Sequence, residues 1–409
     1  MMLPVTEAES IILNLVQPFS QKETEWVELS AAYGRILADS VSSKLDFPHW
    51  DNSAMDGYAV RHQDIQDCNL ENPKTLEIIE EIPAGYRPQK TVQPRQAARI
   101  FTGACLPAGA DTIIMQEDTQ RQGNSVKILT ASKPQAFIRH QGSFYKAGDP
   151  LLQPGIVLGA AEMAVLAAAQ CCQVPVYRRV KVAIFSTGNE LVEPNQPLLP
   201  GQIVDSNHYA LTAWVQSMNM EPISFGIVPD QPEVLKSTIN QAVEIADIVL
   251  STGGVSVGDY DYIEQILSDL GGDIQVRSVA IKPGKPLTVA KFPNCIYFGL
   301  PGNPVSALVT CWRFVQPAIK KCSGLLPQLY QPVYVKARLK QDLRSGGKRE
   351  TYLWGQLHWT DTGYEFELAY GSHNSANLIN LAQTTALAVV PVNQSLITEG
   401  EFVSVLRLN

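Results

Sequence analysis

The sequence predicts a multidomain protein of class α/β plus β, and three observations support this. Its 409 residues exceed what one typical hydrophobic core accommodates. Between residues 180 and 320, short apolar runs alternate with amphipathic helical segments, which is the pattern of a doubly wound parallel sheet covered by helices. Residues 75–145 and 333–409 instead alternate short β-type runs with turns, which predicts two mainly β regions.

The amino-terminal segment predicts a helix. Thr6 and Glu9 have the spacing of a capping box, in which both side chains satisfy free N–H groups. Ile12 and Leu15 belong to the apolar stripe that follows, and Pro18 ends the helix.

The next segments predict a β module inserted into a helical domain. A second short helix is expected over 30–38, followed by an irregular polar stretch over 46–60. Residues 150–172 return to loop and helix. The strands expected in between are Thr75–Ile82, Ala98–Thr102, Thr112–Glu117 and Ser125–Leu129.

The α/β region has four expected strands and four expected helices. The strands are Val180–Phe185, Ile223–Val228, Ile248–Leu250 and Ile296–Leu300. The helices are about His208–Met218, Pro232–Ala246, Tyr260–Leu270 and Val305–Lys320. Pro327–Pro332 is expected to be a linker, and a small C-terminal β domain follows it.

Composition excludes several classes of protein. The net charge of −8 does not favour general binding to nucleic acid or to an anionic membrane. The seven cysteines are odd in number and lack C-x-x-C spacing, which indicates reduced thiols in a cytosolic protein. No secretory leader and no uncharged apolar run of about 20 residues is present, so a cytoplasmic location is expected.

Clusters of Gly, Pro and polar residues directly follow the expected strands. They are 185–191, 250–261, 281–286 and 300–306. Because parallel strands end at one edge of a sheet, the four clusters predict a single site there. Gly-rich turns combined with lysines and carboxylates suit a phosphate-bearing ligand with a metal ion.

The cluster 250–261 carries the most specific pattern. Gly253, Gly254 and Gly258 allow positive φ, and successive N–H groups in such a turn bind anions. Asp259 and Asp261 at the expected start of the next helix have two interpretations. Either the helix dipole stabilises these carboxylates at the helix start, or the carboxylates coordinate Mg²⁺.

The other clusters place charged and capping side chains at the same edge. Asn303 is expected to cap the following helix, with Pro304 in its first turn. Lys282 and Lys285 flank a Pro-Gly pair that would present both ammonium groups from a fixed turn. Glu190 lies just past a strand end. For the lysines and Glu190, ordinary solvation is the alternative.

The combination of motifs resembles one known family. The motifs are Asn52–Ala59, Phe101–Ala104, Ser186–Leu191, Ser251–Asp261, Lys282–Pro286 and Pro301–Ser306, in this order. Together they closely resemble the molybdopterin molybdenumtransferases, the MoeA family, which includes the E domain of gephyrin. The resemblance covers essentially the whole chain.

The resemblance implies four regions and a homodimer with a site shared across its subunits. A discontinuous helical domain would comprise 1–46 and 147–178, and a mainly β domain would be inserted at 47–146. A doubly wound, MogA-like α/β molybdopterin-binding domain would cover 179–326, and a C-terminal β-barrel 327–409. A molybdopterin adenylyltransferase is implied as a further partner.

The resemblance also implies the reaction and its residues. Molybdate would be inserted into adenylylated molybdopterin with release of AMP, in the presence of Mg²⁺ or another divalent cation. The implied catalytic residues are Asp56, Thr102, Glu190, Asp230, Lys282 and Lys285. The implied metal ligands are Glu190 with Asp259 or Asp261. The implied pterin-binding residues are Thr187, Gly188, Ser251, Thr252, Gly253, Gly254, Ser256, Gly258, Pro301, Gly302, Asn303, Pro304, Ser306, Arg349 and Ser372.

Two positions depart from the family pattern. Family members carry Arg-x-x-Gly-Glu-Asp where this chain has Arg139-His-Gln-Gly-Ser143-Phe144, so both carboxylates of that loop are replaced. The family's Thr-Gly-Asp-Glu-Leu becomes Thr-Gly-Asn189-Glu-Leu. The first departure favours one alternative, a non-catalytic binding or scaffold protein on the same fold. Another alternative is the preceding adenylylation step, carried out by a related single-domain fold, and the 409-residue length and the Asp56 segment argue against it.

Overall fold

The computed structural model describes residues 2–253 and 262–408. They form two compact units. The larger unit comprises Met1–Asp39, Pro154–Ala160 and Gln173–Asn409, and the smaller unit comprises Ser40–Gln153 and Ala161–Cys172. No helix in the described part of the chain is long and apolar enough to cross a membrane. The four domain boundaries inferred from the sequence stay predictions.

A six-stranded sheet forms the centre of the larger unit. Its order is β16 (Glu221–Val228), β13 (Lys181–Thr187), β17 (Ile248–Thr252), β21 (Ile296–Leu300), β20 (Pro286–Lys291) and β18 (Asp273–Ser278). The first four strands are parallel, as predicted. Strand β20, which the sequence does not predict, runs antiparallel to both β21 and β18.

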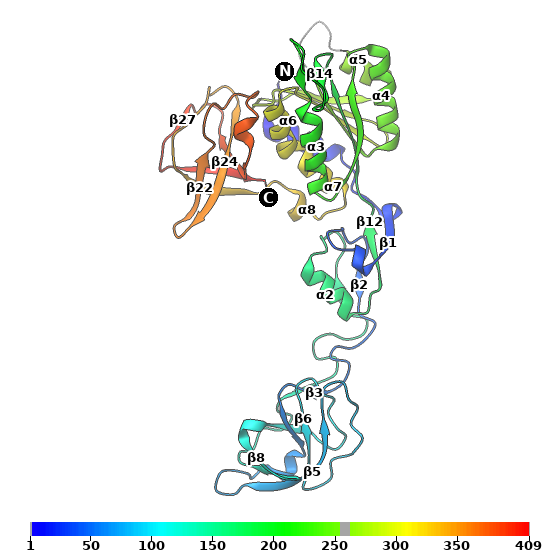
Figure 1. The fold of residues 1–409 in the computed structure, drawn as a ribbon, viewed down its shortest axis with the longest axis vertical. Helices are drawn as coiled ribbons and strands as arrows, with labels where there is room; N and C mark the ends of the chain where they lie inside the picture. Colours follow the sequence, from blue (N-terminus) through cyan, green and yellow to red (C-terminus); the bar gives the residue numbers. More distant parts are fainter. Residues whose placement is uncertain (1, 254–261, 409) are drawn as a thin grey trace. The chain divides into compact units, whose positions relative to one another are not determined.

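Helices cover both faces of this sheet (Figure 1). One face carries α1 (Val5–Leu15), α3 (Ser206–Ser217), α6 (Pro304–Thr310) and α7 (Gln316–Cys322), and the other carries α4 (Pro232–Ile245) and α5 (Ile263–Asp269). Alternate strand residues supply the two cores, because side chains alternate along a strand. Leu250 and Phe298 belong to the first core, whereas Val249 and Tyr297 belong to the second.

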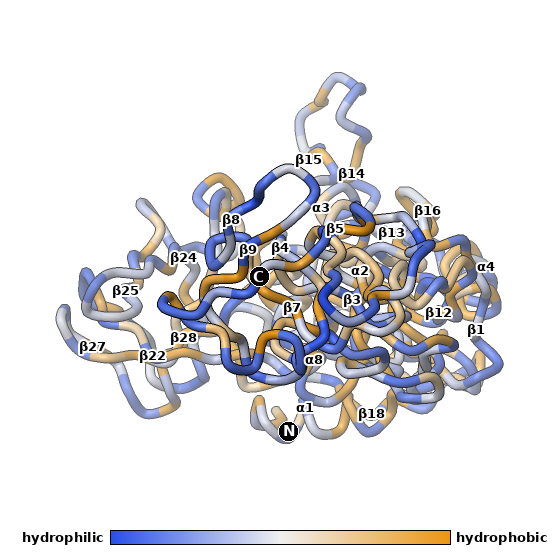
Figure 2. The backbone as a smooth tube through the Cα atoms, turned by 90° about the horizontal axis from the view of Figure 1, so that it is seen from below, coloured by the Kyte–Doolittle hydropathy of each residue, from blue (hydrophilic) through white to orange (hydrophobic). Residues whose placement is uncertain are grey.

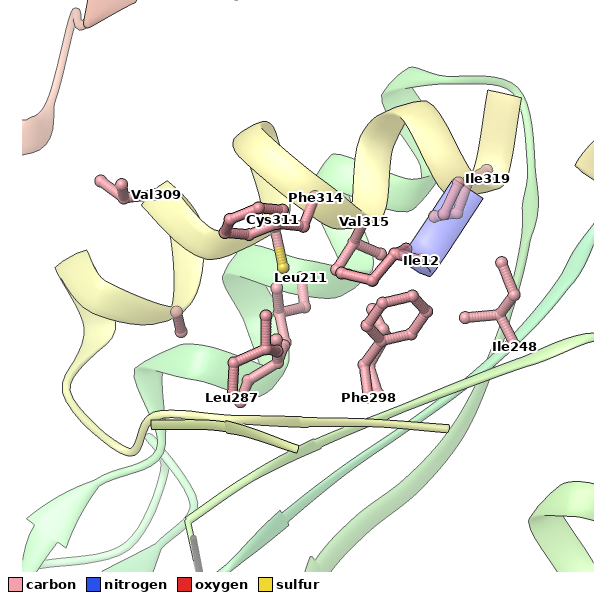
Figure 3. Close-up of a cluster of buried hydrophobic side chains, with 14 of the residues drawn as sticks. Ile12, Leu211, Ile248, Leu287, Phe298, Val309, Cys311, Phe314, Val315 and Ile319 are labelled. Atoms are coloured by element: carbon pink, nitrogen blue, oxygen red, sulfur yellow. The ribbon is translucent and has the colours of Figure 1, made fainter. Parts of the chain in front are cut away.

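The helix that follows β21 contains a π-helical turn. It begins as α6, passes through η5 (Cys311–Val315) and continues as α7. Figure 3 shows Val315 and Ile319 of this helix and Ile12 of α1 above Phe298 and Ile248 of the sheet, and Phe314 belongs to the same core cluster.

The amino-terminal predictions need two corrections. Helix α1 begins at Val5 after Pro4 and has no side-chain cap, so the predicted capping box is wrong. The Leu3 N–H donates to the Ser278 carbonyl of β18 at 3.0 Å, two residues before the helix begins, and Figure 2 marks the amino terminus beside α1. The helix predicted over 30–38 is reduced to η2 (Leu29–Ala31), because Gly34 takes a φ of +73° and the chain then becomes extended.

The C-terminal region closes into a five-stranded barrel, as predicted. The strands are β24 (Glu350–Thr360), β25 (Gly363–Leu368), β22 (Tyr334–Leu339), β28 (Phe402–Arg407) and β26 (Ala386–Val390), and β26 pairs back with β24. The short strand β19 (Ile281–Lys282) joins β24 in parallel and connects barrel and sheet. Residues Pro327–Tyr330 form α8 rather than an extended linker.

The smaller unit contains a second six-stranded sheet. Its order is β7 (Thr112–Met115), β4 (Gly57–Val60), β6 (Gln96–Ile100), β5 (Lys74–Ile82), β9 (Ser125–Ile128) and β8 (Thr119–Gln122). The predicted β module is therefore present. Helix α2 covers Ala160–Ala168.

Short two-stranded pairs occur in both units. They are β1 (Thr24–Glu28) with β12 (Gln173–Tyr177), β2 (Val41–Ser42) with β11 (Pro150–Leu152), β3 (Asn52–Ser53) with β10 (Ile138–Arg139), β14 (Leu191–Val192) with β15 (Ile203–Val204), and β23 (Leu343–Arg344) with β27 (Leu396–Ile397).

Candidate functional site

The parallel strands of the larger unit end in register at one edge of the sheet. Thr187 pairs with Val228, and Thr252 pairs with Leu300, so the ends of all four parallel strands are level. Antiparallel β20 begins at this edge, since its Thr288 pairs with Gly299. The loops that carry Glu190, Asp230, Gly253, Lys285 and Gly302 therefore emerge together, as the sequence predicted.

Three glycines lie where these loops leave the sheet, and Gly253 lets two of the loops approach closely. Gly253 has a φ of +91°, and a Cβ atom there would lie 2.2 Å from the carbonyl oxygen of Thr187. A Cβ atom on Gly302 would lie 3.7 Å from the Cα of Gly253. The carboxylate of Glu190 lies over Gly188, where a Cβ atom would be 2.7 Å from its Oε2. Side chains at these positions would fill the edge that the loops leave open.

Asp230 and Asn189 hold the first loop in place. The Thr187 hydroxyl donates to Oδ1 of Asp230, and the Asp230 N–H donates to Oδ1 of Asn189 at 3.3 Å. Asn189 replaces the family's Asp at a position where only an acceptor oxygen is used. Asn189 can therefore make the same contact with the Asp230 backbone that the family's Asp would make.

Buried polar groups beneath the loops form a connected network that the sequence did not reveal. The Thr252 hydroxyl donates to Ser186 Oγ at 3.0 Å, and Ser186 donates to Oδ1 of Asp205 at 2.9 Å. Asp205 also caps α3 by accepting from the His208 N–H at 3.1 Å. Asn207 Nδ2 donates to the Gly302 carbonyl at 2.8 Å. The only sequence signal was an Asp-x-Asn pattern at the start of a predicted helix.

The Lys-Pro-Gly-Lys turn is fixed from two sides. Arg349 Nη1 donates to the Ile281 carbonyl at 3.1 Å, and β19 pairs with β24 through Lys282 and Thr351. On the other side the turn presses on α6, where a Cβ atom on Gly284 would lie 2.5 Å from the Thr310 hydroxyl. Both lysines are exposed, and the structure gives neither an ion pair among the residues that it describes. Arg349 thus lies next to this turn.

The loop after β21 contacts the barrel. Asn303 Nδ2 donates to Ser375 Oγ at 3.2 Å, and the Val305 N–H donates to the Ser375 carbonyl at 3.3 Å. Asn303 is the N-cap residue of α6 but makes no side-chain cap bond, so that part of the prediction is wrong. Pro304 occupies the first turn, as predicted. Ser372 lies three residues before Ser375, and its carbonyl accepts from Asn377 and Asn380.

The remaining predicted residues of the larger unit belong to the strand ends or to the undescribed segment. Thr187, Ser251, Thr252, Pro301 and Ser306 are buried at the edge. Ser251 Oγ shares a 2.5 Å hydrogen bond with the Tyr297 hydroxyl. The predicted residues outside the described part of the chain are Gly254, Ser256, Gly258, Asp259 and Asp261. Helix α5 begins at Ile263 rather than near Tyr260.

No group of three or more His, Cys, Asp or Glu side chains suited to a metal ion occurs within 2–253 and 262–408. The carboxylate of Glu190 is exposed and has no hydrogen-bond or ion-pair partner within those ranges. It is therefore available as an oxygen ligand, whereas Asp230 is engaged by Thr187.

In the smaller unit, Asp56 and Thr102 contact each other directly. Asp56 Oδ1 accepts from the Thr102 N–H at 2.7 Å and from its hydroxyl at 2.9 Å. These two bonds, the backbone bond foremost, lower the pKa of Asp56 below its ordinary value. The following Gly57 is needed, because a Cβ atom there would lie 1.9 Å from the Ile114 carbonyl oxygen.

The loop that departs from the family pattern is held by two other carboxylates. Asp51 Oδ1 accepts from the Gln141 N–H at 2.7 Å, and Asp46 Oδ2 accepts from the Gln141 side chain at 3.1 Å. Phe144 is 63% exposed, and its ring centroid lies 5.8 Å from that of Phe47. The replacement thus puts an exposed aromatic ring where the family has a carboxylate.

Three family models match the chain in consecutive order. The MoeA N-terminal region (domain I and II) matches residues 3–169, a probable molybdopterin-binding domain matches 183–321, and the MoeA C-terminal region (domain IV) matches 336–408.

Relatives and solved structures agree with these models. A molybdopterin molybdenumtransferase from Nostoc sp. is 59% identical over 99% of this chain and 93% of its own length. One from Haemophilus influenzae is 34% identical over 100% of this chain and 99% of its own. The crystal structure of the molybdopterin biosynthesis MoeA protein from Pyrococcus horikoshii superposes with a TM-score of 0.84 at 30% identity, covering 100% of both chains.

Proposed function

The chain belongs to the MoeA family of molybdopterin molybdenumtransferases, and from this premise we propose that it is a transferase of molybdenum cofactor biosynthesis. The specific reaction we propose is the insertion of molybdate into adenylylated molybdopterin with release of AMP. The observation that carries this proposal is the convergence of four Gly-rich loops at one edge of the sheet, with two free lysines among them.

The loops suit a substrate that contains a pterin and phosphates. The backbone around Gly253 and Gly302 leaves room for close approach of a ligand, and backbone N–H groups at such an edge bind phosphate oxygens. Lys282 and Lys285 are exposed cations on a turn fixed by β24 and α6, so they would bind the oxygens of molybdate or of the phosphates. Both anions are substrates in this proposal.

We propose Mg²⁺ or another divalent cation as the cofactor. The carboxylate of Glu190, which has no partner among the described residues, fits a hard cation, and such a cation prefers oxygen ligands beside phosphates. Asp259 or Asp261 would complete its ligands. The cation would neutralise charge on the phosphates, while Asp230 keeps the loop of Glu190 in place through Thr187.

We further propose a homodimer in which Asp56 and Thr102 of one subunit complete the site of the other. The support is chemical: Thr102 holds the carboxylate of Asp56 and lowers its pKa, although neither residue belongs to that module's apolar core. A molybdopterin adenylyltransferase is the partner class that would supply the substrate. A cytoplasmic location fits the seven free cysteines, of which Cys295, Cys311 and Cys322 are buried with raised pKa values.

The test is the release of AMP from adenylylated molybdopterin by the purified chain with Mg²⁺, with and without molybdate. We expect release that depends on molybdate. Bound pterin without release would contradict the proposal and would favour a binding or scaffold role. Transfer of AMP from ATP to molybdopterin would instead favour the preceding step.

A further inference from the structure

A cavity of about 550 Å³ lies in the larger unit at the amino-terminal edge of the sheet, opposite the candidate site. It is lined by residues that precede β13 and β16, by the end of α3, and by α7 and α8. In Figure 1, α7 and α8 lie at one end of α3, and β14 lies at the other. The cavity is therefore separate from the loops that carry the proposed reaction.

The charge of this cavity is opposite to that of the whole chain. Five basic side chains line it, namely Arg35, Arg178, Arg179, Lys320 and Arg407, and its described lining contains no Asp or Glu. The chain as a whole has a net charge of −8. Such a local excess of positive charge selects an anion.

Two of the five charges are already neutralised. Arg178 donates twice to Asp247 at 2.7 Å, and Arg35 pairs with Glu25. Arg179, Lys320 and Arg407 have no ion-pair partner in the part of the chain that the structure describes. Lys320 is half-buried, and this burial lowers the pKa of its ammonium group. An anion bound in the cavity would stabilise the charged form of Lys320, for which the described residues supply no ion-pair partner.

The cavity also presents flat apolar side chains beside the free charges. Trp312, Gln316 and Lys320 recur at intervals of four residues and share one face of the helix through η5 and α7. Trp214 from α3, Tyr330 from α8 and Tyr177 from β12 also belong to the aromatic lining. A volume of this size matches a small organic ligand.

We propose that this cavity binds an organic anion that carries an aromatic ring, with the ring among Trp214, Trp312 and Tyr330 and the anionic group at Lys320 and Arg179. The site is independent of the proposed transferase reaction.

The test uses 1-anilinonaphthalene-8-sulfonate as the probe and its neutral counterpart, N-phenyl-1-naphthylamine, on the full-length protein. We expect saturable binding of one sulfonate probe per chain, with weaker binding of the neutral one. Lys320→Gln and Arg179→Gln should each weaken sulfonate binding about tenfold, since each removes a charged hydrogen-bond donor. Neither change should affect the neutral probe.

Two further variants locate the site and control for general charge. Trp214→Phe should reduce energy transfer from tryptophan to the probe without changing its affinity. Lys133→Gln removes an exposed lysine of the smaller unit and should leave binding unchanged. The proposal is overturned by absent or unsaturable binding, by equal affinity for both probes, or by an affinity that Lys320→Gln and Arg179→Gln leave unchanged or that Lys133→Gln lowers equally.

Discussion

Arg313 and Glu9 form a two-point ion pair between the π-helical turn and helix α1, with N–O distances of 2.6 and 2.8 Å. Arg313 is only 3% exposed, and its Nε also donates to the Tyr352 hydroxyl of the barrel strand β24 at 2.9 Å. Burial would lower the pKa of Arg313, but the bonds to Glu9 and the nearby tyrosines raise it. One buried cation thus connects α1, the α/β layer and the barrel.

Removing Glu9 should therefore destabilise the larger unit strongly. We expect Glu9→Gln to lower the free energy of unfolding by about 3 kcal/mol, because a buried charge would lose its partner. Thermal or urea unfolding measures this. The exposed pair of Arg277 and Glu264 is the matched control, and Glu264→Gln should cost less than about 1 kcal/mol. Equal effects of the two changes would contradict this account.

Gly253→Ala should weaken both the fold and pterin binding. The substituted residue would need a φ of +91° and would also place its Cβ 2.2 Å from the Thr187 carbonyl oxygen. Gly85 has a φ of +86°, and a Cβ atom there would meet no atom within 4 Å. Gly85→Ala therefore measures only the cost of a positive φ in alanine, about 1 kcal/mol of unfolding free energy. Melting temperatures and pterin titrations separate the two variants. If Gly253→Ala lowered the melting temperature and the pterin affinity no more than Gly85→Ala does, the close contact between Gly253 and Thr187 would be disproved.

The Asp56–Thr102 contact predicts a pH dependence. The pKa of Asp56 is lowered in the folded chain, so the contact's stabilisation is fully present above the unfolded value of 3.8. It is lost as the pH falls through the lower folded value. Thr102→Val keeps the N–H donor but removes the hydroxyl, so the pKa of Asp56 should rise, and Thr102→Ser should preserve it. Carboxyl NMR titration measures the shift. An unchanged Asp56 pKa in the valine variant would show that the hydroxyl is not involved.

Mixing two inactive variants tests the shared site. Asp56→Asn and Glu190→Gln should each abolish AMP release. If the two residues come from different subunits, a mixed dimer contains one intact site, and random mixing should restore about a quarter of the wild-type rate. If both residues come from one subunit, no mixed dimer has an intact site, and mixing restores nothing.

The sequence predicted the parallel strands and the helices between them because apolar runs and their spacing are local signals. It did not reveal the reversed strand β20, since side chains alternate identically in both strand directions. At α1 the local signal of a capping box failed: Leu3 bonds to the Ser278 carbonyl of β18, and Glu9 pairs with Arg313 instead of capping the helix.

The candidate site was predictable to a similar extent. The Gly-rich clusters predicted the convergent loops, and the structure places them at one edge. Asp205 and Asn207 were missed because they act on Ser186 and Gly302, residues from other loops, which no spacing in the sequence encodes. The link between Asp56 and Thr102 came from family resemblance alone, although the two contact directly in the structure.

The most direct test of the proposed function compares Glu190→Gln with Glu193→Gln in molybdate-dependent AMP release. Among residues 2–253 and 262–408, Glu190 has no side-chain partner, whereas Glu193, three residues later, accepts from the Tyr209 hydroxyl at 2.9 Å. The proposal predicts a loss of about 100-fold or more for Glu190→Gln, as for other catalytic groups, and near wild-type release for Glu193→Gln. Undiminished, molybdate-dependent release by the Glu190 variant would contradict the assigned site.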